Sequence, residues 1–323
     1  MQEAVTTVRP PVEVSVLIVN YNGRHLLEAC LQALERNLAT THEVLLVDNA
    51  SQDDSLAFLA QQFPWIRVIA SPVNTGFTGG NNIAAREARG RLLLLLNTDT
   101  EIRTPLAPLL SLMNSQPDCG ALGCRLIYSD DRQQESIGYE PSTLRLVFSW
   151  LPLGRWLPRW SMVRRTLPAA SPLYRNTIAS AQWVSGAFLL TPRALWNSLG
   201  GLDERFFMYM EDTDYCRRVR EAGHRVLYSA LCEVTHFEGA GRPWIGERAV
   251  LNTTDSYLAY MRKFRGRFAL LALRVLLSAV FLARSMANGV AVLTGRDPYG
   301  REKSQAFRRA AWRLLGAGRQ VAR

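Results

Sequence analysis

The chain has 323 residues, 48% of them hydrophobic and 20% charged, so it can bury a large core and hold one or two folded domains. Its formal charge of +10 is uneven: residues 1–140 carry 10 Lys and Arg against 16 Asp and Glu, whereas residues 241–323 carry 16 against 4. The five cysteines form neither a CxxC pair nor a Cys/His cluster, which argues against a disulfide framework or a zinc module and favours reduced thiols in the cytoplasm.

Short apolar runs alternate with helical periodicity in the first half of the chain. The stretch RLLLLLNTDT at residues 91–100 holds five consecutive leucines, as expected of a central strand buried on both faces of a parallel sheet. Strands are expected at residues 12–19, 43–47, 66–70 and 92–96, with helices at 26–38, 54–63 and up to 89. This alternation is typical of βαβ units. The sequence therefore predicts an α/β fold with a doubly wound, mostly parallel sheet and helices on both faces.

Polar residues follow each of the four expected strands. They are Asn20 and Asn22, Asp48 and Asn49, residues 74–82, and Asn97 and Asp99. Ligands bind outside the carboxyl ends of the strands in such sheets, so we expect a nucleotide pocket here, in which glycines let the backbone approach phosphate. A single cluster of this kind would be ordinary turn chemistry. A dinucleotide-binding motif is the alternative, but Gly76, Gly79 and Gly80 do not form G-x-G-x-x-G and follow the third strand.

Short motifs also recur in a definite order through the first 240 residues. They are NYN (20–22), VDNAS (47–51), NTGFTGGNN (74–82), LLNTDT (95–100), WVSGAFLLTPR (183–193), GGLDERFFMYMEDTDYCRRVREAG (200–223) and VTH (234–236). This order resembles family 2 glycosyltransferases of the GT-A fold, and within them the rhamnosyltransferase-like branch. The resemblance covers about residues 12–240, with 12–130 as the nucleotide-sugar-binding half and 175–240 as the acceptor and catalytic half. Residues 241–323 would form a separate segment of basic amphipathic helices.

The resemblance implies inverting transfer of a sugar from a nucleotide-diphosphate donor, a dTDP- or UDP-sugar, with a divalent metal, Mg²⁺ or Mn²⁺. By position, Asp212 would be the catalytic base with Glu211 in support, and Asp99 would bind the metal with His236 beside it. The donor site would be lined by Asn20, Asn22, Asp48, Asn74, Gly76, Asn82 and Asn97.

Two departures from the family pattern refine this expectation. Asn97 stands in place of the first acid of a DxD motif, so the protein would offer the metal one firm carboxylate. No Q-x-x-R-W motif follows Asp212, so the enzyme would be non-processive. On the acceptor side, Trp183 precedes Gly186 at a break in a strand pattern, and its ring could stack on a sugar face.

Each of these assignments has a structural alternative. Asp212 could be the N-cap of a helix expected at residues 213–222, although Glu211, Asp212 and Asp214 clustered beside apolar surface could also raise one another's pKa to suit a base. His236 follows an apolar strand at residues 230–234, where a lone histidine is often structural. Trp183 could equally belong to the core.

The C-terminal segment contains a long apolar stretch. Residues 268–283 are apolar apart from Arg274 and Ser278, and on a helix Arg267, Arg274, Ser278 and Ser285 fall on one narrow stripe. This pattern is typical of a helix that lies in a membrane interface, with a second basic amphipathic helix expected within 296–323. A helix docked on the catalytic domain, or a homodimer contact, is the alternative. Residues 144–168, rich in Trp and Arg, also suit a membrane interface or a lipid-linked acceptor.

These features predict the partners and the location of the protein. Met1–Pro11 is polar, and no run of 18 apolar residues occurs, so neither a signal peptide nor a simple membrane span is expected. We expect a cytoplasmic enzyme, peripheral on the inner face of the cytoplasmic membrane, that contacts an anionic membrane surface and a lipid-linked glycan acceptor. A nucleotide-sugar-modifying or dinucleotide enzyme is one rival. A nucleic-acid-binding protein is another, but the tryptophans and the long apolar helix suit it poorly, and no nucleic acid is expected.

Overall fold

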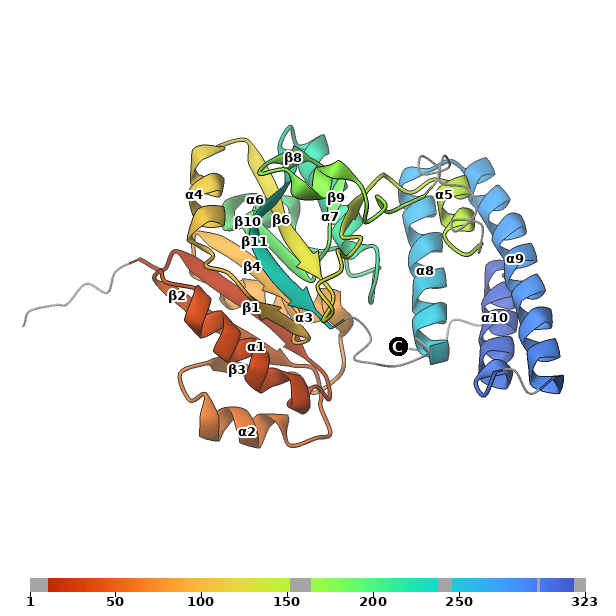
Figure 1. The fold of residues 1–323 in the computed structure, drawn as a ribbon, viewed down its shortest axis with the longest axis horizontal. Coiled ribbons are helices and arrows are strands. Elements are labelled where there is room, and N and C mark those ends of the chain that lie inside the picture. Colours follow the sequence, from red (N-terminus) through yellow and green to blue (C-terminus); the bar gives the residue numbers. More distant parts are fainter. Residues whose placement is uncertain (1–10, 152–163, 238–245, 295–296, 317–323) are drawn as a thin grey trace, which may run out of the picture.

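The centre of the computed structural model, which describes residues 11–151, 164–237, 246–294 and 297–316, is one mixed sheet (Figure 1). Within these residues its order is β3-β2-β1-β4-β10-β6-β11-β5, with β8 beside β11. The strands are β1 (Val14–Asn20), β2 (His42–Asp48), β3 (Arg67–Ala70), β4 (Leu92–Leu96), β5 (Thr100–Ile102), β6 (Cys119–Ile127), β8 (Ala179–Ser180), β10 (Phe188–Pro192) and β11 (Arg225–His236). A small second sheet pairs β7 (Ile137–Gly138) with β9 (Trp183–Val184).

The direction of the strands confirms the predicted doubly wound half. β1 pairs parallel with β2 and with β4, and β2 pairs parallel with β3. β6 and β11 are parallel to each other, whereas β10 runs antiparallel between β4 and β6. The sheet is therefore parallel through its first four strands and mixed beyond them, and the carboxyl ends of β1 to β4 meet at one edge.

The leucines of β4 divide between the two faces of the sheet, as a strand's period of two requires. Leu92, Leu94 and Leu96 join a core with α1 (Arg24–Asn37), α2 (Ser55–Gln62) and α4 (Ala107–Ser115). Leu93 and Leu95 join the opposite core, which includes α3 (Gly76–Glu87), α6 (Arg193–Leu199) and α7 (Glu211–Glu221). Full burial of one leucine side chain contributes about 1.5–3 kcal/mol, so this strand stabilises both layers at once.

The glycine-rich motif differs from the expected strand-end loop. Only Asn74 and Thr75 precede α3, and the rest of the motif forms its first two turns. Gly76 has a φ of +74°, and a Cβ there would lie 2.2 Å from the carbonyl oxygen of Phe207. A Cβ at Gly80 would lie 2.6 Å from Val19 Cγ1 on β1. These two glycines therefore permit close packing of α3, instead of opening space for a phosphate as the sequence suggested.

In the described part of the C-terminal segment, three helices follow the sheet, and contacts cross the expected boundary near residue 240. They are α8 (Gly246–Phe264), α9 (Arg267–Leu293) and α10 (Gly300–Leu314), and they share a third core with α5 (Thr143–Phe148). Phe206 and Met210, from the segment before α7, belong to the same core. In Figure 1, α8 stands between the sheet and the α9–α10 pair. The alternative in which a C-terminal helix docks on the catalytic domain therefore applies to α8. The division into two domains at residue 240 stays a prediction.

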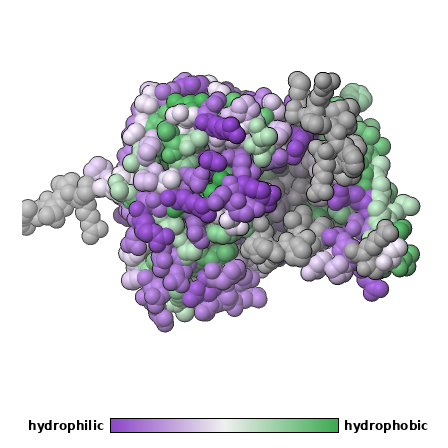
Figure 2. Space-filling view, in the orientation of Figure 1, coloured by the Kyte–Doolittle hydropathy of each residue, from purple (hydrophilic) through white to green (hydrophobic). Residues whose placement is uncertain are grey.

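The two serines of the polar stripe of α9 face inward, which corrects their predicted orientation, whereas Arg267 at its start is exposed. Ser278 Oγ donates to the carbonyl of Ala311 at 3.3 Å, and Ser285 Oγ donates to that of Ser304 at 2.8 Å, so both hydroxyls lie against α10. The exposed side, called here the outer face of α9, is apolar and appears green along the right-hand edge of Figure 2. It comprises Phe268, Leu271, Val275, Leu276, Leu282, Met286, Val290 and Leu293.

The tryptophan-rich stretch is only partly described. Its first residues form α5, and Trp150 packs edge-on against Phe281 and Phe307, with ring centroids 5.0 and 5.8 Å apart. This tryptophan therefore belongs to the helical core and not to a membrane interface. Trp156 and Trp160 lie outside the described residues.

Candidate active site

The first two polar strand ends are joined to each other by side-chain hydrogen bonds. Asn20 Nδ2 donates to Asp48 Oδ2 at 3.0 Å, and these residues are 0% and 2% exposed. Asn49 Nδ2 donates to Asn74 Oδ1 at 3.0 Å, which ties the end of β2 to the start of α3. Asn20 Oδ1 is buried with no hydrogen-bond partner among the described residues. This network holds the loops of the edge in place and leaves one amide oxygen free to accept.

The predicted donor-site residues divide into buried and accessible groups. Asn82 exchanges hydrogen bonds with the backbone of Leu202, both at 2.9 Å, and so joins α3 to the segment that leads to α7. Asn20, Asp48, Gly76 and Asn82 are buried. Asn22 is exposed, and Asn74 and Asn97 are half-buried. Direct donor contact by the accessible three stays a prediction, while the buried four are packed inside the protein.

Asp99 and His236 meet because β5 and β11 pair antiparallel. Thr100, the residue after Asp99, lies opposite His236 in that ladder. His236 Nε2 is 3.3 Å from Asp99 Oδ1 and 3.5 Å from Asn97 Nδ2. The side chains of Asp99 and His236 are 23% and 12% exposed, so both are partly open at the edge of the sheet.

The charge state of Asp99 follows from its surroundings. Burial acts to raise the pKa of Asp99, but the hydrogen bond and charge of His236 outweigh it, and the pKa lies below its ordinary value. On the other side of the ring, His236 Nδ1 is 2.8 Å from Gln134 Oε1. Because that oxygen can only accept, Nδ1 carries a proton and Nε2 faces Asp99. Gln134 was not predicted, since it lies in no motif.

Asp99 and His236 fit a divalent cation as partial ligands. A carboxylate oxygen and an imidazole nitrogen suit Mn²⁺, and carboxylate oxygen suits Mg²⁺. Metal-ligating histidines usually donate their second ring N–H to a neighbouring acceptor, as His236 does to Gln134. Within the part of the chain that the structure describes, no group of three or more His, Cys, Asp or Glu residues could hold a metal. The remaining coordination positions would have to be filled by phosphate oxygens or water.

A second acidic pair lies at the start of α7. Asp212 Oδ2 accepts from Gly186 N at 3.1 Å, and its Oδ1 accepts from Thr213 N at 2.6 Å. The helix begins at Glu211 with Met210 at the cap position, so the alternative in which Asp212 is the N-cap is wrong. An acid in the first turn is still stabilised by the helix dipole. Arg165 Nη2 lies 3.9 Å from Asp212 Oδ1 and adds a positive charge that sequence reasoning had not singled out.

Glu211 and Asp214 differ from Asp212 in their burial and in their hydrogen-bond partners. Glu211 is 6% exposed, its Oε2 has no hydrogen-bond partner among the described residues, and burial followed by the charge of Asp212 raises its pKa to about 8. Asp214 is fully buried and bonds Arg218 at 2.8 Å and Lys263 at 2.5 Å. The expected effect of neighbouring acids is present at Glu211, because the charges of Asp212 and Asp214 both add to burial in raising its pKa, and Glu211 carries a proton at neutral pH. Asp214 also belongs to an ion-pair network.

The raised pKa of Glu211 makes a testable prediction about stability. The folded protein binds this proton more tightly than the unfolded chain, so stability falls as pH rises from the unfolded value of 4.5 to about 8, by at most about 1.4 kcal/mol per pH unit. Glu211→Gln should therefore match the wild type at pH 5 and exceed it at pH 8. Urea unfolding at both pH values measures this, with the exposed Glu221→Gln on the same helix as control. The prediction would be contradicted if the free energies of unfolding of Glu211→Gln and the wild type differed by the same amount at both pH values.

Residues 186 and 187 connect the two acidic pairs. Asn97 N donates to the carbonyl of Ala187 at 3.1 Å, while the adjacent Gly186 N binds Asp212. The end of β4 and the start of α7 are therefore separated by a single dipeptide. A Cβ at Gly186 would lie 3.4 Å from Phe77 and 3.5 Å from Asp212 Cβ, which is ordinary van der Waals contact, so the bridge lies against both residues.

Trp183 lies beneath this bridge and not on its surface. It is 3% exposed, its Nε1 donates to the carbonyl of Tyr139 at 3.0 Å, and the guanidinium of Arg165 lies 4.6 Å from its ring. The expected stacking of an acceptor sugar on Trp183 is not compatible with that burial. Its ring instead supports Arg165, which in turn faces Asp212.

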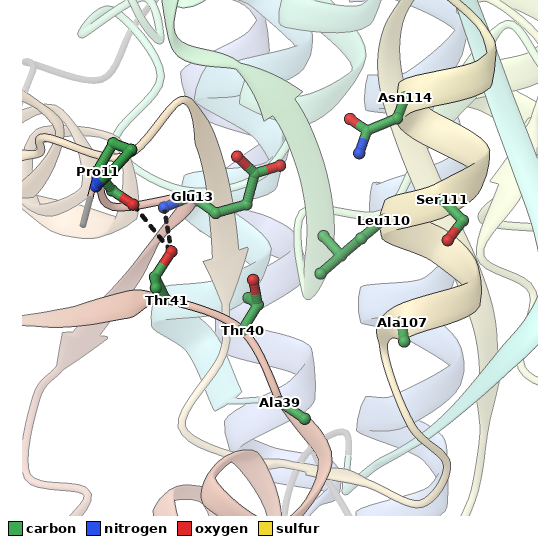
Figure 3. A pocket seen from close by; sticks show the side chains of 9 residues that line it. All are labelled: Pro11, Glu13, Ala39, Thr40, Thr41, Ala107, Leu110, Ser111 and Asn114. Carbon is green, nitrogen blue, oxygen red and sulfur yellow. Dashed lines mark hydrogen bonds between the residues drawn. The ribbon is translucent and has the colours of Figure 1, made fainter.

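A groove of about 530 Å³ lies at the opposite edge of the sheet (Figure 3). Glu13 and Thr41, which line it, directly precede β1 and β2, so the groove is at the amino ends of these strands. Glu13 is paired there with Arg91. Asp99 and Asp212 lie at the other edge, and the candidate active site is therefore separate from this groove.

A partly parallel sheet with an acid–histidine pair and a second acid at the carboxyl edge is the architecture of a GT-A glycosyltransferase. The chain belongs to glycosyl transferase family 2, whose family model matches residues 15–179. The N-acetylglucosaminyl-diphospho-decaprenol L-rhamnosyltransferase of Mycobacterium tuberculosis is 29% identical over 238 residues, which are 68% of this chain and 75% of that protein. The rhamnosyltransferase WbbL of Escherichia coli is 24% identical over 268 residues, 79% of this chain and 96% of that protein.

Solved structures agree on the fold. GalNAc-T7 with UDP, GalNAc and Mn²⁺ superposes with a TM-score of 0.59 at 15% identity, over 93% of this chain and 55% of that chain. The expected fold class, family and rhamnosyltransferase-like branch are thereby confirmed, and the protein is a glycosyltransferase.

Proposed function

We propose that this enzyme transfers a sugar, with rhamnose as the first candidate, from a dTDP- or UDP-sugar to a lipid-linked glycan acceptor, with inversion and without processivity. The similarity to a rhamnosyltransferase whose name specifies a decaprenol-linked acceptor supports this substrate class. The observation that carries the proposal is the bridge at residues 186–187, because it joins Asn97, two residues before Asp99, to Asp212. The Asp99–His236 side of the bridge suits a nucleotide diphosphate, and the Asp212 side suits a hydroxyl group.

On the donor side, Asp99 and His236 would hold Mg²⁺ or Mn²⁺ together with the donor diphosphate. The cation, when bound, supplies the positive charge that stabilises the departing nucleotide diphosphate. Asn97 lies within 3.5 Å of His236 and would orient it or hydrogen-bond a phosphate oxygen. Asn22, after β1, and Asn74, after β3, would contact the nucleoside beside the buried network.

On the acceptor side, Asp212 would accept the proton of the acceptor hydroxyl. The hydroxyl oxygen attacks the anomeric carbon opposite the departing diphosphate, which inverts the configuration there. The Gly186 N–H and Arg165 would hold the carboxylate in place. Glu211, kept neutral by burial, would leave the negative charge of the pair on Asp212.

A donor-hydrolysis screen tests the proposal. Purified protein is incubated with dTDP- and UDP-sugars in Mn²⁺, Mg²⁺ or EDTA, and released nucleotide is measured. Turnover of one donor that depends on the cation is expected. Hydrolysis unaffected by EDTA would contradict metal dependence, and stabilisation by NAD but by no nucleotide sugar in a thermal-shift assay would favour the dinucleotide alternative.

The outer face of α9 supports a location at the membrane. α9 spans 27 residues and is long and apolar enough, by length and composition, to cross a bilayer. Its apolar side chains are exposed, with Phe268 at 82% and Leu293 at 86%, and residues 241–323 carry 16 basic against 4 acidic residues. An apolar face with nearby basic charge binds anionic membrane surfaces. We propose that this face lies on the inner surface of the cytoplasmic membrane, where a lipid-linked acceptor would be found.

Replacement of three residues on that face should weaken membrane binding strongly. The combined variant Leu271→Gln, Val275→Gln, Met286→Gln removes exposed apolar contacts, so cosedimentation with anionic liposomes should weaken by about tenfold or more while donor hydrolysis is kept. Leu56→Gln with Trp65→Gln, which alters exposed apolar residues on the catalytic domain, is the matched control. Unchanged liposome binding would contradict the proposal, and a dimer of the wild type that the triple variant lacks would identify a homodimer contact instead.

A further inference from the structure

The turn before α7 has an unusual backbone conformation. Tyr209 and Met210 both have a φ of 70°, in the left-handed region that non-glycine residues rarely adopt. Glu211 and Asp212 follow directly. Two such residues in succession persist only when surrounding contacts hold them, so the direction in which Asp212 leaves the turn depends on what packs against it.

Those contacts come from α8. Ser256 Oγ donates to the carbonyl of Met208 at 2.9 Å, and Met210, 1% exposed, packs in the core that α8 shares with the other C-terminal helices. Lys263 Nζ bonds Asp203 at 2.6 Å and Asp214 at 2.5 Å. One of these acids precedes the turn and the other follows it. The helix therefore clamps both ends of the turn and one carbonyl within it.

The opposite side of the turn contacts the donor half. Phe207 O accepts from Phe77 N at 3.0 Å. Any side chain at residue 76 would collide with Phe207, so α3 packs directly against the turn there. The turn is consequently held between α3 and α8. A change in the position of α8 would therefore move Glu211 and Asp212, which follow the turn.

We propose that α8 is a positioning element for catalysis: Ser256 and Lys263 hold the turn at residues 206–210 so that Asp212 meets the acceptor hydroxyl. This inference rests on the proposed role of Asp212 as the base. Ser256 acts through the backbone carbonyl of Met208, and Lys263 acts through the carboxylates of Asp203 and Asp214 on the two sides of the turn. A small displacement of a catalytic group lowers turnover without necessarily changing substrate affinity.

Two matched serine variants test the proposal. Ser256 and Ser278 are both 3% exposed and both donate to a backbone carbonyl, but Ser278 bonds Ala311, away from the turn. Ser256→Ala and Ser278→Ala should lower the melting temperature by similar amounts. Only Ser256→Ala should lower kcat, by about 10- to 100-fold, with the donor KM within about twofold of wild type. Rates are normalised to the number of donor-binding sites measured by calorimetry.

The possible results separate this inference from the proposed function. Equal kcat values for Ser256→Ala and Ser278→Ala, with Asp212→Asn inactive, would overturn the positioning role alone. A parallel loss of kcat and donor affinity in Ser256→Ala would also overturn it, because that pattern indicates general disruption. Full transfer by Asp212→Asn would overturn the assignment of the base and this inference with it.

Discussion

Asp212→Asn is expected to lower sugar transfer by about 10²- to 10⁴-fold while donor affinity stays near that of the wild type. The amide has the shape of the carboxylate and can still accept from Thr213 N, but it cannot take a proton from the acceptor. Its NH₂ group cannot accept from Gly186 N, so a loss of about 0.5–1.5 kcal/mol in stability accompanies the change. Transfer rates and calorimetric donor binding, measured on the same preparation, check both parts.

The control for this variant is Asp118→Asn. Asp118 is a half-exposed acid paired with Arg225 at the amino end of β6, away from the site, and its replacement should leave transfer unchanged. If Asp212→Asn instead loses stability but keeps its activity per folded molecule, the acid serves only the fold of the bridge and the α7 N-terminus.

Asp99→Ala is expected to remove metal-dependent donor binding and leave the fold intact. Its carboxylate is partly open at the edge of the sheet, and its loss leaves His236 as the remaining ligand of the pair. Loss of a residue that only orients a metal ligand typically costs about 10- to 100-fold in metal affinity, so loss of the carboxylate should cost more. Calorimetry of the donor with and without Mn²⁺ measures the effect.

Gln134→Ala provides a graded comparison for Asp99→Ala. Removal of the acceptor of His236 Nδ1 frees the ring to rotate, so metal-dependent affinity should fall by about 10- to 100-fold and not be abolished. Nucleotide-sugar affinity that is equally enhanced by Mn²⁺ in the wild type and in Asp99→Ala would refute the metal assignment.

The local pattern of the chain was sufficient for the first half of the fold. The five leucines at 92–96 make both faces of a strand apolar, which indicates that the strand is buried on both sides. The polar Asn97 marks where it ends. The same reasoning identified β1, β2 and β3 to within a few residues, because βαβ units place consecutive strands in parallel and their polar ends on one edge. The candidate acids were found from the order of the motifs.

Contacts distant in sequence decided the rest. His236 lies beside Asp99 only because β11 pairs with β5, and Asp212 reaches the same region only through Gly186. Burial gave Glu211 its raised pKa and turned Trp183, Asn20 and Asp48 into supporting residues. In each case the sequence identifies the chemical group, while its exposure depends on segments more than 25 positions away.

The helix α9 shows most clearly what the local sequence determined and what tertiary packing decided. Its sequence determined that one stripe is polar and the rest apolar, since the helical period is a local property. It did not determine which side is covered, and the structure packs Ser278 and Ser285 against α10. Buried hydroxyls need partners, and the backbone carbonyls of α10 supply them. The sequence thus determined the elements, their periodicity and the candidate groups, whereas tertiary packing alone decided which faces are buried and which groups meet.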